Sequence, residues 1–449
     1  MAKLFGTDGV RGLANEELSP ELAMQIGRAG AYALAGHMGR RPKILIGTDT
    51  RLSADMLEAA LVAGLCSVGA EVFRAGVIPS PAMAYLVRHY GMDAGVMLSA
   101  SHNPMPDNGI KFFDGTGYKL SDEIEAEIEA LINEGSSEIP RPTGEGVGCC
   151  HPCPNADIDY ATFLAGTVPE NFAEGMTVAI DCANGAASKA ASMAFKKAGA
   201  NVLAIHNNPT GLNINLDCGS THLESLQEFV KSNKVDMGLA FDGDADRVLG
   251  IDENGDIIDG DVIMAVCGLA MKRKGHLKNN AIVATVMSNM GLDLFCKKEG
   301  IKLLRTPVGD RYVIQEMVSG EYNIGGEQSG HIIFRDYNTT GDGVLTGLQL
   351  LLTLKESGQK MSQLRKVMEV LPQVLLGAKL KSRIRSDVRQ NEKIDKAIKE
   401  LEEKLGDSGR VLVRPSGTEP LVRVMIEGPK ESEIKKWAED LVKLIESEL

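Results

Sequence analysis

Hydrophobic residues recur along the chain in a strand–helix–strand order that appears three times. The first unit has an apolar strand at 43–49, a helix, a turn marked by glycine and a second strand at 69–73. The second unit joins strands at 176–181 and 199–203, and the third joins strands at 281–286 and 300–304. Each unit predicts a parallel βαβ motif. Three α/β domains in tandem fit 449 residues better than one large sheet does.

The end of the chain follows a different pattern. Strands are predicted at 374–380, 410–414 and 421–426, with amphipathic helices at 394–405 and 434–445. This β-α-β-β-α order indicates a smaller α+β domain. We therefore predict three tandem α/β domains of similar βαβ topology and a C-terminal α+β domain, arranged around a central cleft. The expected domains are 1–153, 154–249, 250–368 and 369–449, with a linker near Pro372.

Composition and charge exclude several classes of protein. Hydrophobic residues make up 43% of the chain and charged residues 24%, as in ordinary globular proteins. The formal net charge of −13 argues against nucleic acid or an anionic membrane as the main partner. No apolar run is long enough to span a bilayer, and the first residues lack the apolar core of a signal peptide. We therefore expect a cytoplasmic protein.

Cysteine usage does not indicate a disulfide framework, because eight cysteines are spread over a long chain. Cys149, Cys150 and Cys153 cluster around His151. This cluster has the side chains for a soft metal, but no second Cys/His pair follows nearby to complete a tetrahedral site. The sequence favours a proline-flanked loop with incidental thiols.

Three aspartates at alternate positions form the most distinctive motif. Asp242, Asp244 and Asp246 are followed by Arg247. Crowded carboxylates favour a hard divalent cation such as Mg²⁺ or Ca²⁺, and Arg247 suits an anion that shares the metal. An EF-hand is the alternative, with Glu253 at position twelve, but Arg247 stands where that loop needs glycine. Because the flanking segments are typical of strands, we predict a Mg²⁺ site between two strands.

A second motif follows an apolar strand at 95–100. Ser101, His102, Asn103 and Pro104 lie at its carboxyl end, where ligands bind in α/β sheets. A serine beside a histidine is a candidate nucleophile. A plain turn rich in polar residues is equally compatible with this motif alone.

A third polar loop spans 325–331, between two apolar segments. Its glycines let a backbone approach a ligand, and Glu327, Gln328 and Ser329 carry the donors and acceptors that sugar hydroxyls need. His331 is a candidate general acid or base, or a structural histidine.

Two further loops suit anions. Arg414, Ser416, Gly417 and Thr418 offer a guanidinium, hydroxyls and backbone N–H groups to a phosphate, and Arg423 adds charge. A hairpin turn with incidental polar residues is the alternative. The glycine-rich loop 5–12 contains Arg11 and is compatible with an anion site, although such loops are weak evidence alone.

In combination, these motifs resemble those of the α-D-phosphohexomutases. The resemblance covers the whole chain, in the order 99–104, 242–247, 325–331 and 414–420. It implies that Ser101 carries a phosphoryl group and that its phosphate shares one Mg²⁺ with Asp242, Asp244 and Asp246. It also implies a phosphosugar substrate, a sugar bisphosphate as intermediate and activator, and a homodimer.

The resemblance assigns roles to the remaining residues. Arg247 would stabilise the phosphoryl group during its transfer, while Glu327, Gln328 and Ser329 would bind the sugar. Arg414, Ser416, Gly417, Thr418 and Arg423 would hold the phosphate that is not reacting. Arg11, His102, Lys111 and His331 would surround the reacting oxygens, with Lys111 or His331 transferring the proton.

Within that family, the sequence of residues 5–12 and 99–104, together with Gln328, is most similar to the bacterial branch that acts on glucosamine phosphate. Mannose or glucose phosphate is the alternative substrate. A metal-dependent phosphatase or a non-catalytic phosphosugar-binding protein is an alternative of a different class. Residues 148–153 depart from what we associate with the family's first linker.

Overall fold

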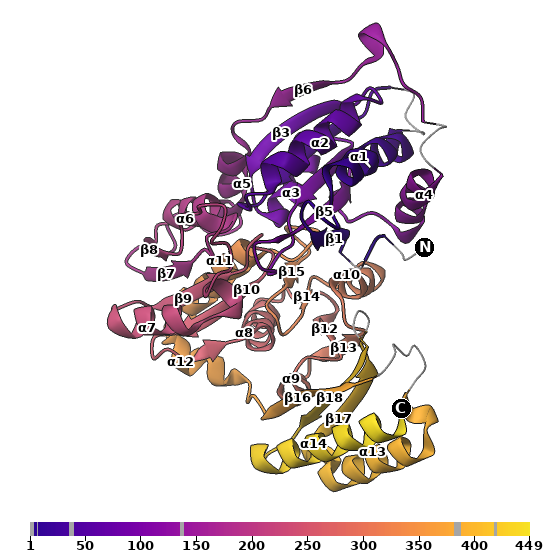
Figure 1. Cartoon of the computed structure of the whole chain (residues 1–449). Coiled ribbons are helices and arrows are strands. Elements are labelled where there is room, and N and C mark those ends of the chain that lie inside the picture. Colours follow the sequence, from indigo (N-terminus) through magenta and orange to yellow (C-terminus); the bar gives the residue numbers. More distant parts are fainter. Residues whose placement is uncertain (1–3, 7, 36–39, 135–138, 381–387, 417–419) are drawn as a thin grey trace. The chain divides into compact units, whose positions relative to one another are not determined.

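The computed structural model describes residues 4–6, 8–35, 40–134, 139–380, 388–416 and 420–449. The chain forms two compact units, which Figure 1 traces by colour along the sequence. The first comprises Met1–Met287 and Lys302–Lys366, and the second comprises Ser288–Ile301 and Val367–Leu449.

The first sheet of the first unit has six strands. These are β1 (Val10–Leu13), β2 (Lys43–Thr48), β3 (Glu71–Val77), β4 (Ala94–Leu98), β5 (Asp107–Asp114) and β6 (Cys149–Pro152). Their order in space is β1-β5-β4-β2-β3-β6, and β5 pairs antiparallel with both β1 and β4. The helices of this region are α1 (Pro20–Ala35), α2 (Ala54–Cys66), α3 (Ser80–His89) and α4 (Asp122–Asn133). Buried side chains of β2 and β3 pack with α1 and α2 in one apolar cluster.

The segment at 149–152 is a strand, so the prediction of a proline-flanked loop is wrong. A short 3₁₀ helix, η1 (Gly144–Gly146), precedes β6, which then pairs parallel with β3 at the edge of the sheet. Gly148 allows this approach, since a Cβ there would lie 2.0 Å from the carbonyl oxygen of Ala70. The sequence offered no alternation of apolar residues because β6 is an edge strand with exposed cysteines.

The second sheet contains the aspartate motif. Its strands are β7 (Thr177–Asp181), β8 (Asn201–Ile205), β9 (Met237–Phe241), β10 (Val248–Asp252) and β11 (Ile257–Ile258), in the order β11-β10-β9-β7-β8. Its helices are α5 (Ala156–Ala165), α6 (Ala187–Lys197), η2 (Gly219–Thr221) and α7 (Glu224–Ser232). The predicted strands on either side of residues 242–247 are confirmed as the antiparallel pair β9 and β10. The expected domain boundary after residue 249 falls inside β10.

The third sheet is smaller. Its strands β12 (Ala281–Thr285), β13 (Lys302–Thr306), β14 (Ile324–Gly326) and β15 (Ile332–Phe334) lie in the order β13-β12-β14-β15. The surrounding helices of the first unit are α8 (Gly260–Arg273), η3 (Lys278–Asn280), α10 (Asp310–Ser319), α11 (Gly343–Ser357), α12 (Met361–Leu364) and η4 (Arg365–Val367, which ends just past the unit). The helix between β12 and β13, α9 (Met290–Glu299), belongs to the second unit.

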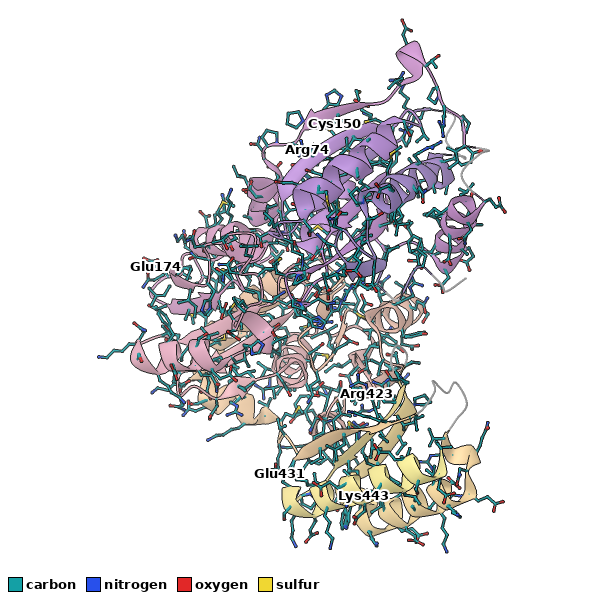
Figure 2. All side chains as sticks on the ribbon, viewed as in Figure 1. Arg74, Cys150, Glu174, Arg423, Glu431 and Lys443 are labelled. Carbon is teal, nitrogen blue, oxygen red and sulfur yellow. The ribbon has the colours of Figure 1, made fainter. Side chains whose placement is uncertain are left out.

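The second unit contains an antiparallel sheet in the order β16-β18-β17. Its elements are β16 (Gln373–Lys379), η5 (Val388–Gln390), α13 (Glu392–Leu405), η6 (Gly406–Ser408), β17 (Arg410–Pro415), β18 (Leu421–Glu427) and α14 (Glu431–Glu448). Apolar residues of the strands and of α13 and α14 form one core. In Figure 2, labelled Arg423 lies on β18 and Glu431 and Lys443 lie on α14.

The predicted architecture is confirmed: three α/β regions and a smaller α+β region. The pairs β2–β3, β7–β8 and β12–β13 are parallel, as the three repeats predict, and the last region has the β-α-β-β-α order. Among the described residues, no helix is long and apolar enough to cross a membrane.

Candidate active site

Ser101 lies in a tight turn just beyond the carboxyl end of β4. It is buried and has a left-handed backbone, with φ of +53°, which residues other than glycine rarely adopt. Its Oγ donates a hydrogen bond to Oδ2 of Asp242 at 2.6 Å. The turn therefore aims the hydroxyl of the candidate nucleophile at the aspartate motif, and strain of this kind clusters at functional sites.

A buried ion pair holds the serine turn in place. Arg51 and Asp49 are paired at 2.9 Å with fully buried side chains. The Arg51 guanidinium donates to the carbonyl oxygens of Ser101, Asn103, Pro104 and Asp107. Asp49 accepts from Ser99 Oγ at 2.6 Å, and that oxygen accepts from Ser101 N at 3.0 Å. This pair was not predicted from the sequence, although two charged residues directly after a buried strand were a signal.

A second support reaches the serine turn from the region of the second sheet. Asn215 Nδ2 donates to the carbonyl oxygens of Ser101 and Asn103 at 2.9 and 3.0 Å. Gly243 passes so close that a Cβ would lie 2.6 Å from Ser101 O. The serine turn and the aspartate loop are thus fixed against each other by backbone contacts that only glycine permits at this position.

The three aspartates converge in the loop between β9 and β10. Asp242, Asp244 and Asp246 are buried, and one carboxylate oxygen from each lies within 4.8 Å of the others. Asp244 Oδ2 accepts from Ser80 Oγ at 2.6 Å and from Lys111 Nζ at 2.8 Å. The other oxygen of Asp244 and the Oδ1 of Asp246 are buried without a hydrogen-bond partner among the described residues.

The electrostatics of this cluster call for a cation. Burial, reinforced by Asp246 and Asp244, raises the pKa of Asp242 well above its ordinary value. Buried carboxylate oxygens without donors are costly, and a hard divalent ion bound by oxygen ligands removes that cost. The residues present therefore fit such an ion, with Asp242, Asp244 and Asp246 as its candidate ligands.

Arg247 and His102 lie beside the cluster. Arg247 is partly buried, and although burial disfavours its charge, Asp246 and Asp242 raise its pKa. Its Nη1 contacts Nδ1 of His102 at 2.6 Å. Burial, with Arg247 and Arg11, lowers the pKa of His102 to about 4. At neutral pH the imidazole is therefore uncharged, and it accepts from Arg247.

A row of alternating charges extends from the aspartates. Lys111 Nζ lies 2.8 Å from Asp244 and 2.9 Å from Asp8, which also pairs with Arg11. Burial opposes the charge of Lys111, but these carboxylates outweigh it and raise its pKa. Lys119 bridges Asp8 and Asp310. Only Arg11 and Lys111 were predicted here. Asp8 lies in the predicted loop 5–12 but was given no role, and residues 119 and 310 carry no motif and meet it only in the fold.

His331 lies at the far end of that row. Its Nδ1 is 3.5 Å from Asp246 and its Nε2 is 3.7 Å from Asp310, while Gly341 N donates to Nε2 at 3.1 Å. Burial opposes protonation, but Asp246 and Asp310 outweigh it and raise the pKa of His331. The imidazole is thus tied to the metal-ligand cluster through Asp246.

The predicted sugar loop lies between β14 and β15. Glu327 Oε1 accepts from Gly309 N at 3.3 Å and its Oε2 accepts from Ser329 Oγ at 3.4 Å. Gln328 donates instead to Asp259 Oδ2 at 3.3 Å, at the start of α8. A cavity of about 450 Å³ adjoins this region, and its lining includes Lys119, Asp310 and His331. Such a volume accommodates a small ligand.

The predicted phosphate loop belongs to the second unit. Arg414 and Arg423 are register partners on β17 and β18, and burial together with Arg423 lowers the pKa of Arg414. Ser416 is buried, and its N–H donates to Leu421 O at 2.8 Å. Like charges directly opposite each other are unfavourable without an anion. Gly417 and Thr418 lie outside the described residues.

The structure therefore gathers most of the predicted residues of the first unit in one site. Direct contacts to the aspartate cluster come from Ser101, Lys111, Arg247 and His331. His102 reaches it through Arg247, and Arg11 reaches it through Asp8 and Lys111. Glu327 and Ser329 lie on the loop that ends at His331. Arg414, Ser416 and Arg423 form a group of their own in the second unit.

Four family models together match most of the chain. Their descriptions are phosphoglucomutase/phosphomannomutase alpha/beta/alpha domains I, II and III and the C-terminal domain, over residues 2–138, 159–255, 259–371 and 375–444 respectively. Residues 139–158, which include β6, fall between the first two matched ranges.

Relatives of the same length are also similar. The phosphoglucosamine mutase of Ruminiclostridium cellulolyticum is 58% identical over 449 residues, and that of Acetivibrio thermocellus is 56% identical, each covering 100% of both chains. A crystal structure of a phosphoglucomutase/phosphomannomutase family protein from Burkholderia thailandensis has a TM-score of 0.82 at 22% identity, covering 99% of this chain and 97% of that one. At that identity the similarity concerns the fold alone.

Proposed function

The chain belongs to the phosphoglucomutase/phosphomannomutase family, and we propose that it is a phosphoglucosamine mutase. It would interconvert glucosamine 6-phosphate and glucosamine 1-phosphate through a phosphoserine enzyme and a bisphosphorylated sugar. The choice of sugar is supported by relatives that carry this name at 54–58% identity along nearly the full length of the chain.

One observation carries the proposed chemistry. Ser101 Oγ lies 2.6 Å from Asp242, in a turn held by Arg51 and Asn215, beside carboxylate oxygens that have no donor in the described part of the chain. A serine phosphate in this position would bring its oxygens next to Arg247 and Lys111. The resulting pairing of anionic phosphate with fixed cations is how phosphoryl-transfer sites lower their barrier.

In the first half-reaction, the phosphate on Ser101 moves to the free hydroxyl of the sugar phosphate. The bond between phosphorus and Ser101 Oγ breaks while a bond to the sugar oxygen forms, and the hydroxyl proton leaves to a base. Arg247 stays charged throughout, so it stabilises the negative oxygens of the transferring group, and Lys111 does the same if His331 carries the proton. Lys111 or His331 as the proton carrier stays a prediction.

A divalent ion held by Asp242, Asp244, Asp246 and the oxygen on Ser101 would neutralise the transferring phosphoryl group. We propose Mg²⁺, one ion per chain, because the donors are all hard oxygens. Asp244 is held by Ser80 and Lys111, so its free oxygen is already oriented before an ion arrives.

In the second half-reaction, the sugar bisphosphate presents its other phosphate to Ser101. The intermediate must turn end for end, so the groups that hold it must accept either phosphate. Arg414, Ser416, Gly417, Thr418 and Arg423 are proposed to hold the phosphate that is not reacting, and Glu327, Gln328 and Ser329 the sugar. The paired guanidiniums of Arg414 and Arg423 are compatible with a dianion and not with a neutral group.

Two further expectations stay predictions: a homodimer and a cytoplasmic location. We also propose that the predicted linker near Pro372 allows a hinge motion that admits the turning intermediate. The domain boundaries proposed from the sequence also stay predictions.

The decisive test combines mass spectrometry of the purified protein with turnover in Mg²⁺. We expect a stable phosphate on Ser101, localised by fragmentation against Ser99, which is two residues away. Ser101→Ala should lose the phosphate and at least about 10³-fold in turnover, because the nucleophile carries the covalent step. Full activity in Ser101→Ala would overturn the mechanism.

A second assay tests the sugar. Glucosamine, mannose and glucose 6-phosphates should be compared with the same enzyme preparation, primed with the matching bisphosphates. We expect the highest kcat/KM for glucosamine 6-phosphate. A higher value for mannose or glucose 6-phosphate would leave the family intact and refute the proposed substrate.

A further inference from the structure

A second cluster of metal-ligating side chains lies far along the first sheet from Ser101, on β3 and β6. Glu71, Cys149 and His151 each offer one ligand atom, and these atoms lie within 4.8 Å of one another. The sequence alone singled out Cys149 and His151 but disfavoured a metal there for lack of a nearby partner, and the proposed function uses none of the three. The cluster also lies partly in residues 139–158, which the family models of domains I and II leave unmatched.

The parallel register of β3 and β6 creates the cluster. Glu71 is the direct partner of Cys149, and His151 follows two residues later on the same side of the strand. Side chains alternate between the faces of a strand, so all three project from one face. Phe73, the register partner of His151, lies against the imidazole with ring centroids 5.4 Å apart and restricts its orientation.

Two of the three separations between the ligand atoms are already close to those that a tetrahedral zinc ion requires, and the third is below 4.8 Å. Zn–S distances of about 2.3 Å and Zn–N or Zn–O distances of about 2.0–2.1 Å at tetrahedral angles give S···N of about 3.5 Å and N···O of about 3.3 Å. In the structure, Cys149 Sγ lies 3.2 Å from His151 Nε2, and that nitrogen lies 3.5 Å from Glu71 Oε1. Small side-chain shifts therefore suffice for binding.

The chemistry of the donors selects the metal. One thiol, one imidazole and one carboxylate suit a borderline divalent ion such as Zn²⁺ and do not suit Mg²⁺, which takes oxygen ligands. A thiolate and a carboxylate also balance the two positive charges. The cluster is accessible to such an ion, since Cys149 is an exposed free thiol and the His151 side chain is 45% exposed.

We propose that Glu71, Cys149 and His151 bind one Zn²⁺ ion, with the fourth position open to water. Binding releases the thiol proton of Cys149 to solvent as the Zn–S bond forms. The ion ties the edge strand β6 to β3, at the point where the chain leaves the first sheet for α5. The role is structural and independent of the phosphosugar reaction.

Cys150 provides a matched control. It is the register partner of Val72, on the opposite face of β6, and it is exposed like Cys149. Figure 2 labels Cys150 together with Arg74, the residue of β3 that lies on that same face. Cys150→Ser therefore removes a neighbouring thiol that is also exposed, without changing the proposed ligands.

The test uses the full-length, reduced protein with Mg²⁺ in excess, so that the aspartate site is filled. Titration with Co²⁺, a spectroscopic substitute for Zn²⁺, should give a thiolate-to-cobalt charge-transfer band that saturates at one equivalent and disappears when Zn²⁺ is added. Cys149→Ser should abolish the charge-transfer band, and His151→Gln should weaken Co²⁺ binding by about tenfold or more. Cys150→Ser should change neither the band nor the affinity for Co²⁺.

Thermal unfolding supplies a second measurement. Zn²⁺ alone should raise the Tm of the wild type and of Cys150→Ser, since an ion that binds only the folded state stabilises it, but not that of Cys149→Ser. The absence of the charge-transfer band in the wild type, its persistence in Cys149→Ser, or its equal loss in Cys150→Ser would each overturn the proposal. Phosphosugar turnover should be unchanged in Cys149→Ser, so this proposal and the proposed function fail separately.

Discussion

The aspartate loop between β9 and β10 and the Glu71–Cys149–His151 cluster are two candidate metal sites built in opposite ways. The aspartates are buried and held by Ser80, Lys111 and Arg247. The second cluster lies largely exposed on an edge strand, and its ligand atoms mainly contact one another. A buried carboxylate that has no hydrogen-bond or metal partner is unfavourable, so the aspartate site needs fixed partners. The Glu71–Cys149–His151 cluster is exposed, and water solvates its side chains when no ion is bound.

The two sites differ in how many hydrogen bonds support them. Arg51 alone donates to four backbone carbonyls around Ser101, and no comparable support reaches Cys149 among the described residues. A site that performs chemistry needs its reacting groups preorganised, while a site that only holds an ion tolerates adjustment. Changes in the first region should therefore have far larger consequences than equivalent changes in the second.

The largest expected effect is from Asp242→Asn. The substitution keeps the shape and an acceptor for Ser101 but removes one anionic ligand, so we expect turnover to fall by about 10³–10⁴-fold, several kcal/mol of transition-state stabilisation. Steady-state kinetics in Mg²⁺ measure this. Asp236→Asn, an exposed aspartate just before β9, is the matched control and should retain wild-type turnover. Comparable losses in the two variants would contradict the assignment.

A second prediction concerns the support and not the site. Arg51→Met leaves Asp49 buried without its partner, so we expect the free energy of unfolding to fall by about 3–5 kcal/mol. The serine turn should also lose its geometry, lowering kcat. Urea unfolding measures the first effect. Lys274→Met removes a cation from an exposed pair with Glu356 and should cost no more than about 1 kcal/mol. Equal losses of unfolding free energy in the two variants would show that the buried Arg51–Asp49 pair contributes no more to stability than an exposed pair.

A third prediction compares the aspartates with a buried carboxylate that has donors. Asp342 accepts hydrogen bonds from Tyr160, Asn338 and Leu345 N, yet burial raises its pKa to about 6. The folded protein therefore binds this proton more tightly than the unfolded chain does. Its contribution to stability is greatest below about pH 4 and is lost as the pH rises to about 6, by roughly 2–3 kcal/mol.

Asp342→Asn cannot ionise, so the difference between wild-type and variant free energies of unfolding should change across that pH range. Urea unfolding at several pH values between 4 and 7 measures the difference. A constant difference would mean that Asp342 titrates equally in the folded and unfolded states.

The smallest expected effect is from Cys149→Ser. Because the thiol is exposed and remote from the chemistry, we expect its turnover to stay within about twofold of wild type and its metal-free stability within about 0.5 kcal/mol. Kinetic assays and urea unfolding in the presence of a chelator, with Mg²⁺ restored for turnover, check both. A large loss of turnover would mean that the two regions are coupled, which would break the comparison.

Local apolar runs and the helical spacing of apolar residues were sufficient to predict much of the fold. The strands at β2, β7 and β12 and the order of elements after residue 373 follow from patterns within short segments. The edge strand β6 was not predicted, because the exposed cysteines of an unburied strand form no such pattern. The third repeat was right in its strand pairing, while its helix α9 belongs to the second unit, which no local pattern reveals.

The sequence by itself determined the fold class and the chemistry-bearing motifs, because a serine turn after a strand and three alternate aspartates are local in the chain. Only the tertiary structure decided which residues support them. Asp8, Arg51, Lys119, Asn215 and Asp310 come from separate elements and meet only when the sheets pack. The same holds for Glu71, which the register of two strands brings to Cys149 and His151. Contacts between residues distant in sequence depend on packing and register, which a linear pattern of side chains does not encode in readable form.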